Sequence, residues 1–133
     1  MFLKLAKQAG VRKVVLASSA AVYGDNPIVP KTEEMLPEPR SPYVVTKLDG
    51  EYYLELYRRE YGLGATSLRF FNVFGPRQNP RSPYAAAVPI FIQQAIDGDQ
   101  PRDFIYVKDI VSALSHVARS GIVDTLVYTQ IVI

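Results

Sequence analysis

Short apolar runs alternate with amphipathic segments along most of the 133 residues, and this order constrains the fold more than any other feature. The clearest runs are Val14 to Ala17 and about Thr66 to Phe71. Runs of this kind are typical of strands that are buried on both faces of a parallel sheet. Strands that alternate with helices predict a parallel sheet with helices packed on it. The sequence therefore predicts an α/β fold.

The helix that follows the proline-rich stretch has the clearest boundaries. Ser41 is a suitable N-cap, Pro42 suits the first turn, and Gly62 follows the last helical residue, Tyr61. Weaker signals predict other elements before and after this helix. They are helices over 2–9, 87–98 and 108–121, and strands over 103–107 and 124–133.

Composition excludes several classes of protein. The chain has no cysteine and a single histidine, His116, so neither disulfides nor a metal-ligand cluster is expected. The net charge of +2, with acidic and basic residues interspersed, gives no case for binding nucleic acid. No apolar run approaches the roughly 20 residues of a membrane span, and the N-terminal segment is too short and too regularly amphipathic for a signal peptide. We therefore expect a cytoplasmic protein.

Tyr43 and Lys47 lie four residues apart near the start of the helix that begins at Pro42. Residues at this spacing share a helix face, and a neighbouring ammonium favours the ionised form of a phenol. Such a tyrosine can act as a general base or acid. Ser19 ends a predicted strand, where open α/β sheets bind ligands, and could hydrogen-bond the same substrate hydroxyl. Without further context, the spacing is common and favours an ordinary structural pair.

Four motifs change that interpretation: "LASSAAVYGDNPIVPKTEE", "SPYVVTK", "LRFFNVFGPRQNP" and "RDFIYVKDI", in this order. Together they closely resemble the extended short-chain dehydrogenase/reductases of the NAD-dependent epimerase/dehydratase family, and most of all the UDP-glucose and UDP-N-acetylglucosamine 4-epimerases. The resemblance extends from about Leu5 to Tyr128. It implies part of a Rossmann-like, doubly wound parallel sheet. Residues 1–79 would be the C-terminal half of the NAD(P)-binding domain, and 80–133 part of a small substrate-binding region with a returning helix and strand.

The resemblance implies a catalytic role for three residues. Ser19 matches the family's catalytic serine, Tyr43 its base, and Lys47 the lysine that holds the nicotinamide ribose. The implied reaction is a transient oxidation of a UDP-sugar at C4, in which NAD⁺ takes the hydride while Tyr43 takes the hydroxyl proton. The hydride then returns to the opposite face of the 4-keto sugar, without net redox change.

The same resemblance places further residues around the two ligands. Asn72 and Arg102 match positions that contact the diphosphate, and a planar guanidinium suits phosphate oxygens. The residues expected on the cofactor are Ser18, Tyr43, Lys47 and Phe71. The residues expected on the substrate are Ser19, Tyr43, Asn72, Arg102 and, beside the uracil, Ala87 and Val88. No metal is implied.

Several alternatives stay open. Dehydratases that resemble this chain usually carry an Asp-Glu pair directly after the catalytic serine or threonine, where this chain has Ala20 and Ala21, so dehydration is disfavoured. A decarboxylase or a reductase is not excluded, nor is the sugar fixed. Tyr23 either lines the sugar site or packs under the proline-rich loop. Arg69 and Arg77 are either phosphate ligands or members of surface ion pairs.

The glycine-rich fingerprint that holds a dinucleotide is absent, since the chain contains neither GxGxxG nor GxxGxxG. That turn places the pyrophosphate at a helix N-terminus, so we expect a fragment that does not bind NAD tightly by itself. Two hypotheses follow. The chain is either the catalytic part of a UDP-sugar 4-epimerase, or a non-catalytic remnant or dimerising module without NAD. For full-length members, the resemblance implies a homodimer.

Overall fold

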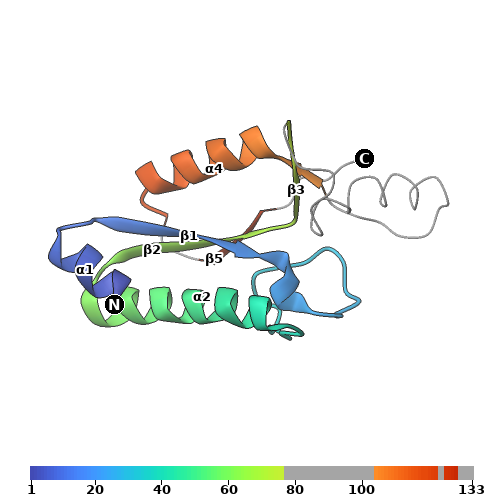
Figure 1. The fold of residues 1–133 in the computed structure, drawn as a ribbon, viewed down its shortest axis with the longest axis horizontal. Helices are drawn as coiled ribbons and strands as arrows, with labels where there is room; N and C mark the ends of the chain where they lie inside the picture. Colours follow the sequence, from blue (N-terminus) through green and yellow to red (C-terminus); the bar gives the residue numbers. More distant parts are fainter. Residues whose placement is uncertain (77–103, 123–124, 129–133) are drawn as a thin grey trace.

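A parallel sheet with the strand order β1-β2-β5 forms the centre of the computed structural model, which describes residues 1–76, 104–122 and 125–128 (Figure 1). β1 spans Lys13–Ser19, β2 Gly64–Phe70 and β5 Thr125–Tyr128. The predicted α/β fold with parallel strands is confirmed. The helix predicted over 87–98 lies outside the described residues.

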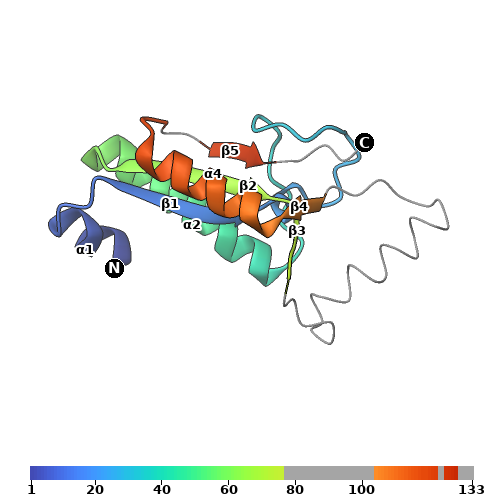
Figure 2. The same ribbon diagram turned by 90° about the horizontal axis from the view of Figure 1, so that it is seen from above.

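Two long helices cover opposite faces of the sheet. Helix α2 (Pro42–Tyr61) lies on one face, and helix α4 (Val107–Arg119) lies on the other (Figure 1). The short helix α1 (Phe2–Gln8) lies at the opposite end of the sheet from strands β3 and β4, as two perpendicular views show (Figures 1 and 2). Among the described residues, no helix combines the length and the apolar character that crossing a bilayer requires.

The pairing of β1 with β2 aligns the carboxyl ends of the two strands. Their register runs from Lys13 opposite Gly64 to Ser19 opposite Phe70. β2 pairs in the same direction with β5, up to Phe70 opposite Tyr128. Because all three strands run in parallel, the segments that leave them emerge at the same edge of the sheet, where ligands bind in folds of this kind.

Helix α2 begins and ends at the residues that the sequence predicts. The Ser41 side chain accepts a hydrogen bond from the backbone N–H of Val44 at 3.4 Å, and Pro42 occupies the first turn. At the other end, Gly62 adopts the left-handed conformation with φ of 65° and donates to the carbonyl of Arg58, and the N–H of Leu63 donates to the carbonyl of Tyr57. Both caps are local, so they could be read from neighbouring residues alone.

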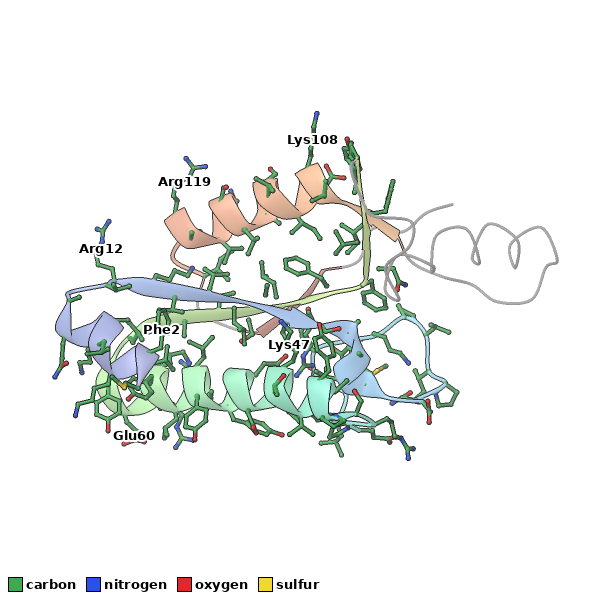
Figure 3. The ribbon with its side chains drawn as sticks, viewed as in Figure 1. Phe2, Arg12, Lys47, Glu60, Lys108 and Arg119 are labelled. Atoms are coloured by element: carbon green, nitrogen blue, oxygen red, sulfur yellow. The ribbon has the colours of Figure 1, made fainter. Side chains whose placement is uncertain are left out.

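The core on the α4 side of the sheet is apolar. Its buried residues come from β2, β4 and α4, namely Leu68, Phe70, Ile105, Ile110 and Val117. The charged residues Lys108 and Arg119 point away from the sheet on the outer side of α4 (Figure 3). The helix is thus amphipathic, as predicted, and Asp109 lies in its first turn, where a negative charge favours the helix dipole.

On the α2 side, β2 is joined to the helix by a buried ion pair between Arg69 and Glu51. Arg69 Nη2 lies 2.7 Å from Glu51 Oε2, and the two side chains are 7% and 5% exposed. Burial lowers the pKa of Arg69, but hydrogen bonds to Glu51 and Tyr23 and the Glu51 charge outweigh it and raise that pKa overall. Arg69 is therefore charged and enclosed. Both roles considered for it from the sequence, phosphate ligand and surface ion pair, are wrong.

A second parallel sheet of two strands adjoins the first. β3 (Asn72–Phe74) pairs with β4 (Phe104–Tyr106), with Asn72 opposite Phe104. The rings of Phe74 and Tyr106 pack with their centroids 5.5 Å apart. β4 agrees with the strand predicted over 103–107. β3 was not predicted, because three residues are too few for a periodic signal.

Gly24 and Gly62 provide a matched test of backbone geometry. Both have positive φ, at 57° and 65°. A Cβ at Gly24 would lie 2.3 Å from the backbone oxygen of Glu38, whereas a Cβ at Gly62 would meet nothing within 4 Å. Gly62→Ala should cost about 1–2 kcal/mol through φ alone. Gly24→Ala should cost about 1–3 kcal/mol more, because its ψ of −133° lies outside the left-handed helical region that Gly62 occupies and because the loop backbone must move. Urea unfolding measures both, and equal costs would contradict the close approach.

Removal of one partner from the buried ion pair should destabilise the chain strongly. Arg69→Met leaves the Glu51 carboxylate buried without its cation, and we expect a loss of about 3–5 kcal/mol in the free energy of unfolding. Arg69→Met combined with Glu51→Leu removes both charges and should recover most of that loss. Chemical denaturation of the single and double variants checks this. A double variant as unstable as the sum of its singles would contradict the pairing.

Candidate active site

Ser19 lies at the carboxyl edge of the sheet. It is the last residue of β1 and the N-cap of the 3₁₀ helix η1 (Ala20–Tyr23). Its Oγ accepts a hydrogen bond from the backbone N–H of Ala21 at 3.2 Å. A hydroxyl both donates and accepts, so the half-buried Ser19 keeps its own hydrogen for a substrate oxygen.

Tyr43 and Lys47 occupy the first turns of α2, on the side that faces the end of β1. Lys47 Nζ lies 5.6 Å from the centroid of the Tyr43 ring, so the predicted shared helix face is confirmed. Lys47 points from α2 toward the end of β1 (Figure 3) and donates to the carbonyl oxygen of Ala17 at 2.9 Å. This bond reaches the strand two residues before Ser19. Tyr43 is 51% exposed, so its phenol is accessible from solvent.

The groups in this region fit the nicotinamide-ribose end of NAD. An ammonium has three N–H donors, and the Lys47 bond to Ala17 uses one of them. The remaining donors suit the hydroxyl oxygens of a ribose. The accessible phenol of Tyr43 and the hydroxyl of Ser19 can exchange or share a proton with a bound alcohol. The arrangement is therefore suited to proton transfer at an alcohol oxygen.

Ser18 and Tyr23 lie beneath this surface. The Ser18 hydroxyl donates to the Glu51 carboxylate, and the Tyr23 hydroxyl accepts from Arg69 Nη1 at 2.9 Å. Burial raises the pKa of Tyr23, although the hydrogen bond and charge of Arg69 act in the opposite direction. Tyr23 is fully buried and packs against Val22 and Val44. Two roles were considered for Tyr23, lining the sugar site or packing under the proline-rich loop, and the structure supports packing.

The hydrogen-bonded group of Ser18, Tyr23, Glu51 and Arg69 was not predicted from the sequence. Two signals could have revealed it. Glu51 follows Lys47 by four residues and so lies on the same face of α2. Arg69 interrupts an otherwise apolar or small-residue strand, and a charge there requires a buried partner.

The remaining predicted site residues are only partly described. Phe71 directly follows β2, is half-buried and packs against the core on the α4 side. Asn72 begins β3 and is also half-buried. Both leave the sheet beside Ser19, since Ser19 pairs with Phe70. Ala87, Val88 and Arg102 lie outside the described residues, as does Arg77.

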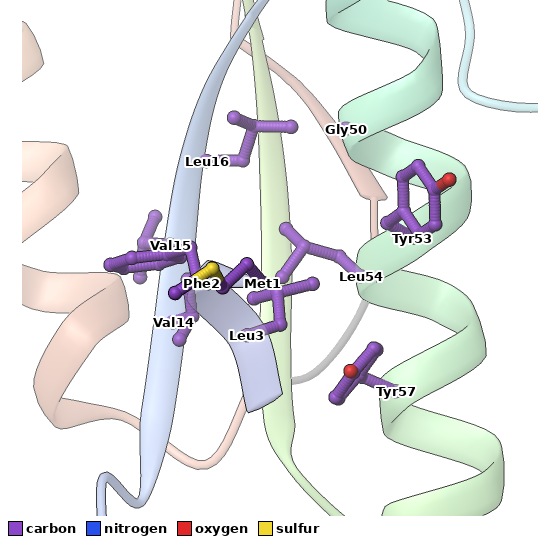
Figure 4. Close-up of a pocket in the computed structure, with 10 residues that line it drawn as sticks. All are labelled: Met1, Phe2, Leu3, Val14, Val15, Leu16, Gly50, Tyr53, Leu54 and Tyr57. Atoms are coloured by element: carbon purple, nitrogen blue, oxygen red, sulfur yellow. The ribbon is translucent and has the colours of Figure 1, made fainter. Parts of the chain in front are cut away.

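An apolar groove of about 460 Å³ lies away from these residues, between α1, the middle of β1 and the later turns of α2 (Figure 4). Leu16 and Leu54 point into it from the strand and from the helix (Figure 4). Tyr53 and Tyr57 line the groove from the same helix as Leu54, well past Tyr43 along α2. The groove has no charged lining residue and is separate from the proton-transfer groups.

Comparison with known proteins shows the family of this chain. Residues 2–127 match the model of the NAD dependent epimerase/dehydratase family. A UDP-glucose 4-epimerase of Mycolicibacterium smegmatis is 42% identical over 118 residues, which are 81% of this chain and 37% of that protein. The chain thus spans less than two fifths of this curated relative.

Solved structures show the same fold. A UDP-N-acetylglucosamine 4-epimerase of Methanobrevibacter ruminantium, in complex with UDP-N-acetylmuramic acid, superposes with a TM-score of 0.82 at 42% identity, over 96% of this chain and 45% of that one. A UDP-glucose 4-epimerase of Thermus thermophilus, in complex with NAD, gives 0.78 at 33% identity, over 96% and 46%. Dehydratases also match, at 27% and 30% identity. The chain belongs to the NAD-dependent epimerase/dehydratase family, with the Rossmann-like fold of its members.

Proposed function

We propose that this chain supplies the proton-transfer part of a UDP-sugar 4-epimerase. The observation that carries the proposal is the position of Lys47, whose ammonium lies beside the Tyr43 ring and is bonded to β1 just before Ser19. Relatives and solved structures with 4-epimerase names support the choice of reaction.

In the proposed mechanism, Tyr43 is the group that moves the proton. Its phenolate oxygen takes the proton from the sugar 4-hydroxyl, becomes a neutral phenol and holds the proton while the sugar is a ketone. Tyr43 then returns this proton to the same oxygen, so it acts first as a base and then as an acid. Ser19 donates to the sugar oxygen, and Lys47 holds the ribose of NAD. The bound dinucleotide supplies the hydride acceptor and donor.

The substrate's nucleotide would bind beyond the edge of the sheet. Asn72 is the first residue of β3, two residues after β2 ends, and is proposed to contact the diphosphate, with Arg102. Phe71 would lie beside the nicotinamide. Ala87 and Val88 are proposed contacts of the uracil.

Ala20 and Ala21 support epimerisation over dehydration. They form the first turn of η1, directly after Ser19. Loss of water from a sugar requires an acid for the departing hydroxyl and a base for the neighbouring carbon, and alanine provides neither.

The proposal can be tested in a hybrid enzyme. In this hybrid, the chain replaces the matched 118-residue segment of the Mycolicibacterium smegmatis relative. We expect interconversion of UDP-glucose and UDP-galactose without accumulation of NADH. Tyr43→Phe should lower kcat by about 10²–10⁴-fold, because it removes the group that exchanges the proton. Chromatography of the two sugar nucleotides measures the conversion.

Tyr52→Phe is the matched control, since Tyr52 lies on the same helix and is also exposed. It should leave kcat unchanged. A folded hybrid that holds NAD but converts neither sugar would contradict the proposal, and so would full activity in Tyr43→Phe. Net formation of NADH would identify an oxidative reaction in place of epimerisation.

A further inference from the structure

We propose that Ser18, Tyr23, Glu51 and Arg69, called here the buried cluster, are positioning residues that set where Ser19 lies relative to Tyr43 and Lys47. This inference rests on the function proposed above. No role in the reaction is otherwise assigned to Tyr23, Glu51 or Arg69.

Each member of the buried cluster belongs to an element that carries a site residue or adjoins one. Ser18 directly precedes Ser19, and Tyr23 ends the helix η1 that Ser19 caps. Glu51 lies one turn after Lys47 on α2. Arg69 is paired with Ser18 across the sheet. The cluster thus connects β1, η1, α2 and β2.

The hydrogen bonds of the buried cluster involve one residue before Ser19 in the sequence and one residue after it. Ser18 donates to Glu51, and Tyr23 accepts from Arg69 at 2.9 Å. Arg69 and Glu51 are themselves joined through Arg69 Nε at 3.1 Å and 3.2 Å and through Nη2 at 2.7 Å. Ser18, directly before Ser19, and Tyr23, at the end of the helix that Ser19 caps, are therefore both bonded to one ion pair.

Helix α2 also contacts β1 at two consecutive residues. Lys47 donates to the carbonyl of Ala17, and Glu51 accepts from the hydroxyl of Ser18. Because Lys47 and Glu51 are one helical turn apart, a slide of α2 along the strand would break both bonds together. The helix is thereby fixed along its axis, and Tyr43 with it.

The chemistry of the buried cluster suits placement better than stability. A buried ion pair often contributes no more stability than apolar residues of similar volume. A guanidinium that binds a carboxylate through two N–H groups is, however, directional in both distance and angle. Proton transfer depends on such placement, since a misplacement of about 1 Å can lower a rate about 10²-fold. Among the described residues, no buried side-chain nitrogen or oxygen lacks a partner, so the cluster is fully bonded.

The test removes single hydroxyls and keeps the ion pair. Tyr23→Phe deletes the bond to Arg69, and Ser18→Ala deletes the bond to Glu51. Tyr23→Phe is the deciding variant, because Ser18 is also an expected cofactor contact. Thr66→Val is the matched control. Thr66 is 1% exposed, and its hydroxyl donates to the Ile122 carbonyl at 2.8 Å. Because Thr66 precedes Arg69 by three residues in β2, its side chain lies on the other face of the strand.

The first readout is NMR of the 133-residue chain and requires no activity. We expect all three variants to lower the urea midpoint to a similar degree. Tyr23→Phe and Ser18→Ala should shift the Ala17 carbonyl carbon, the Ser19 amide and the Lys47 Nζ resonances, whereas Thr66→Val should leave them in place. Shifts no larger than those of Thr66→Val would overturn the proposal.

The second readout is the kinetics of the hybrid enzyme. Tyr23→Phe should lower kcat about tenfold or more, with the KM for UDP-glucose within about twofold, since misplacement acts on the transition state rather than on binding. Thr66→Val should change neither. Equal kcat for Tyr23→Phe and Thr66→Val in an active hybrid would overturn the positioning role. An inactive hybrid would count against the proposed function alone, and the NMR shifts would then decide this inference.

Discussion

The ion pair between Arg69 and Glu51 constrains how helix α2 lies on the sheet. Apolar side chains can hold a helix against a sheet in many nearby positions, because the hydrophobic effect is not directional. A buried guanidinium–carboxylate pair permits very few such positions, because its hydrogen bonds require defined distances and angles. Since α2 carries Tyr43 and Lys47, the enclosed charge at Glu51, near the middle of this helix, determines where its first turns lie.

The parallel register of β1 and β2 then decides which polar groups meet. The two strands end together, with Ser19 opposite Phe70. Phe71 and Asn72 therefore leave the sheet beside the serine, although about 50 residues of chain separate them from it. Three separate segments contribute to one edge of the sheet, and the apolar groove between α1 and α2 takes no part.

The features that the sequence predicts well have local causes. The limits of α2 follow from Ser41, Pro42 and Gly62, which act within one turn of the helix ends. The pairing of Tyr43 with Lys47 follows from helical spacing alone. The alternation of strands and helices predicts the parallel sheet without specifying its register.

The features that the sequence does not predict depend on partners far along the chain. Arg69 is buried because Glu51, 18 residues earlier, supplies an opposite charge. Tyr23 is enclosed because Arg69, 46 residues later, gives its hydroxyl a donor. Strand β3 exists because β4 lies beside it, not because of its own three residues. The secondary-structure propensity of a residue carries no information about such distant partners.

The distance along the chain between β1 and β2 also sets the order in which the molecule can assemble. Lys13 pairs with Gly64, which is synthesised 51 residues later, and at roughly 5–20 residues per second the ribosome needs about 3–10 s to reach it. The hydrogen bonds of α2 are local, and a helix of this length forms in about 1 μs. The helix with its Tyr43–Lys47 face can therefore exist before β1 gains the neighbour that gives Ser19 its place.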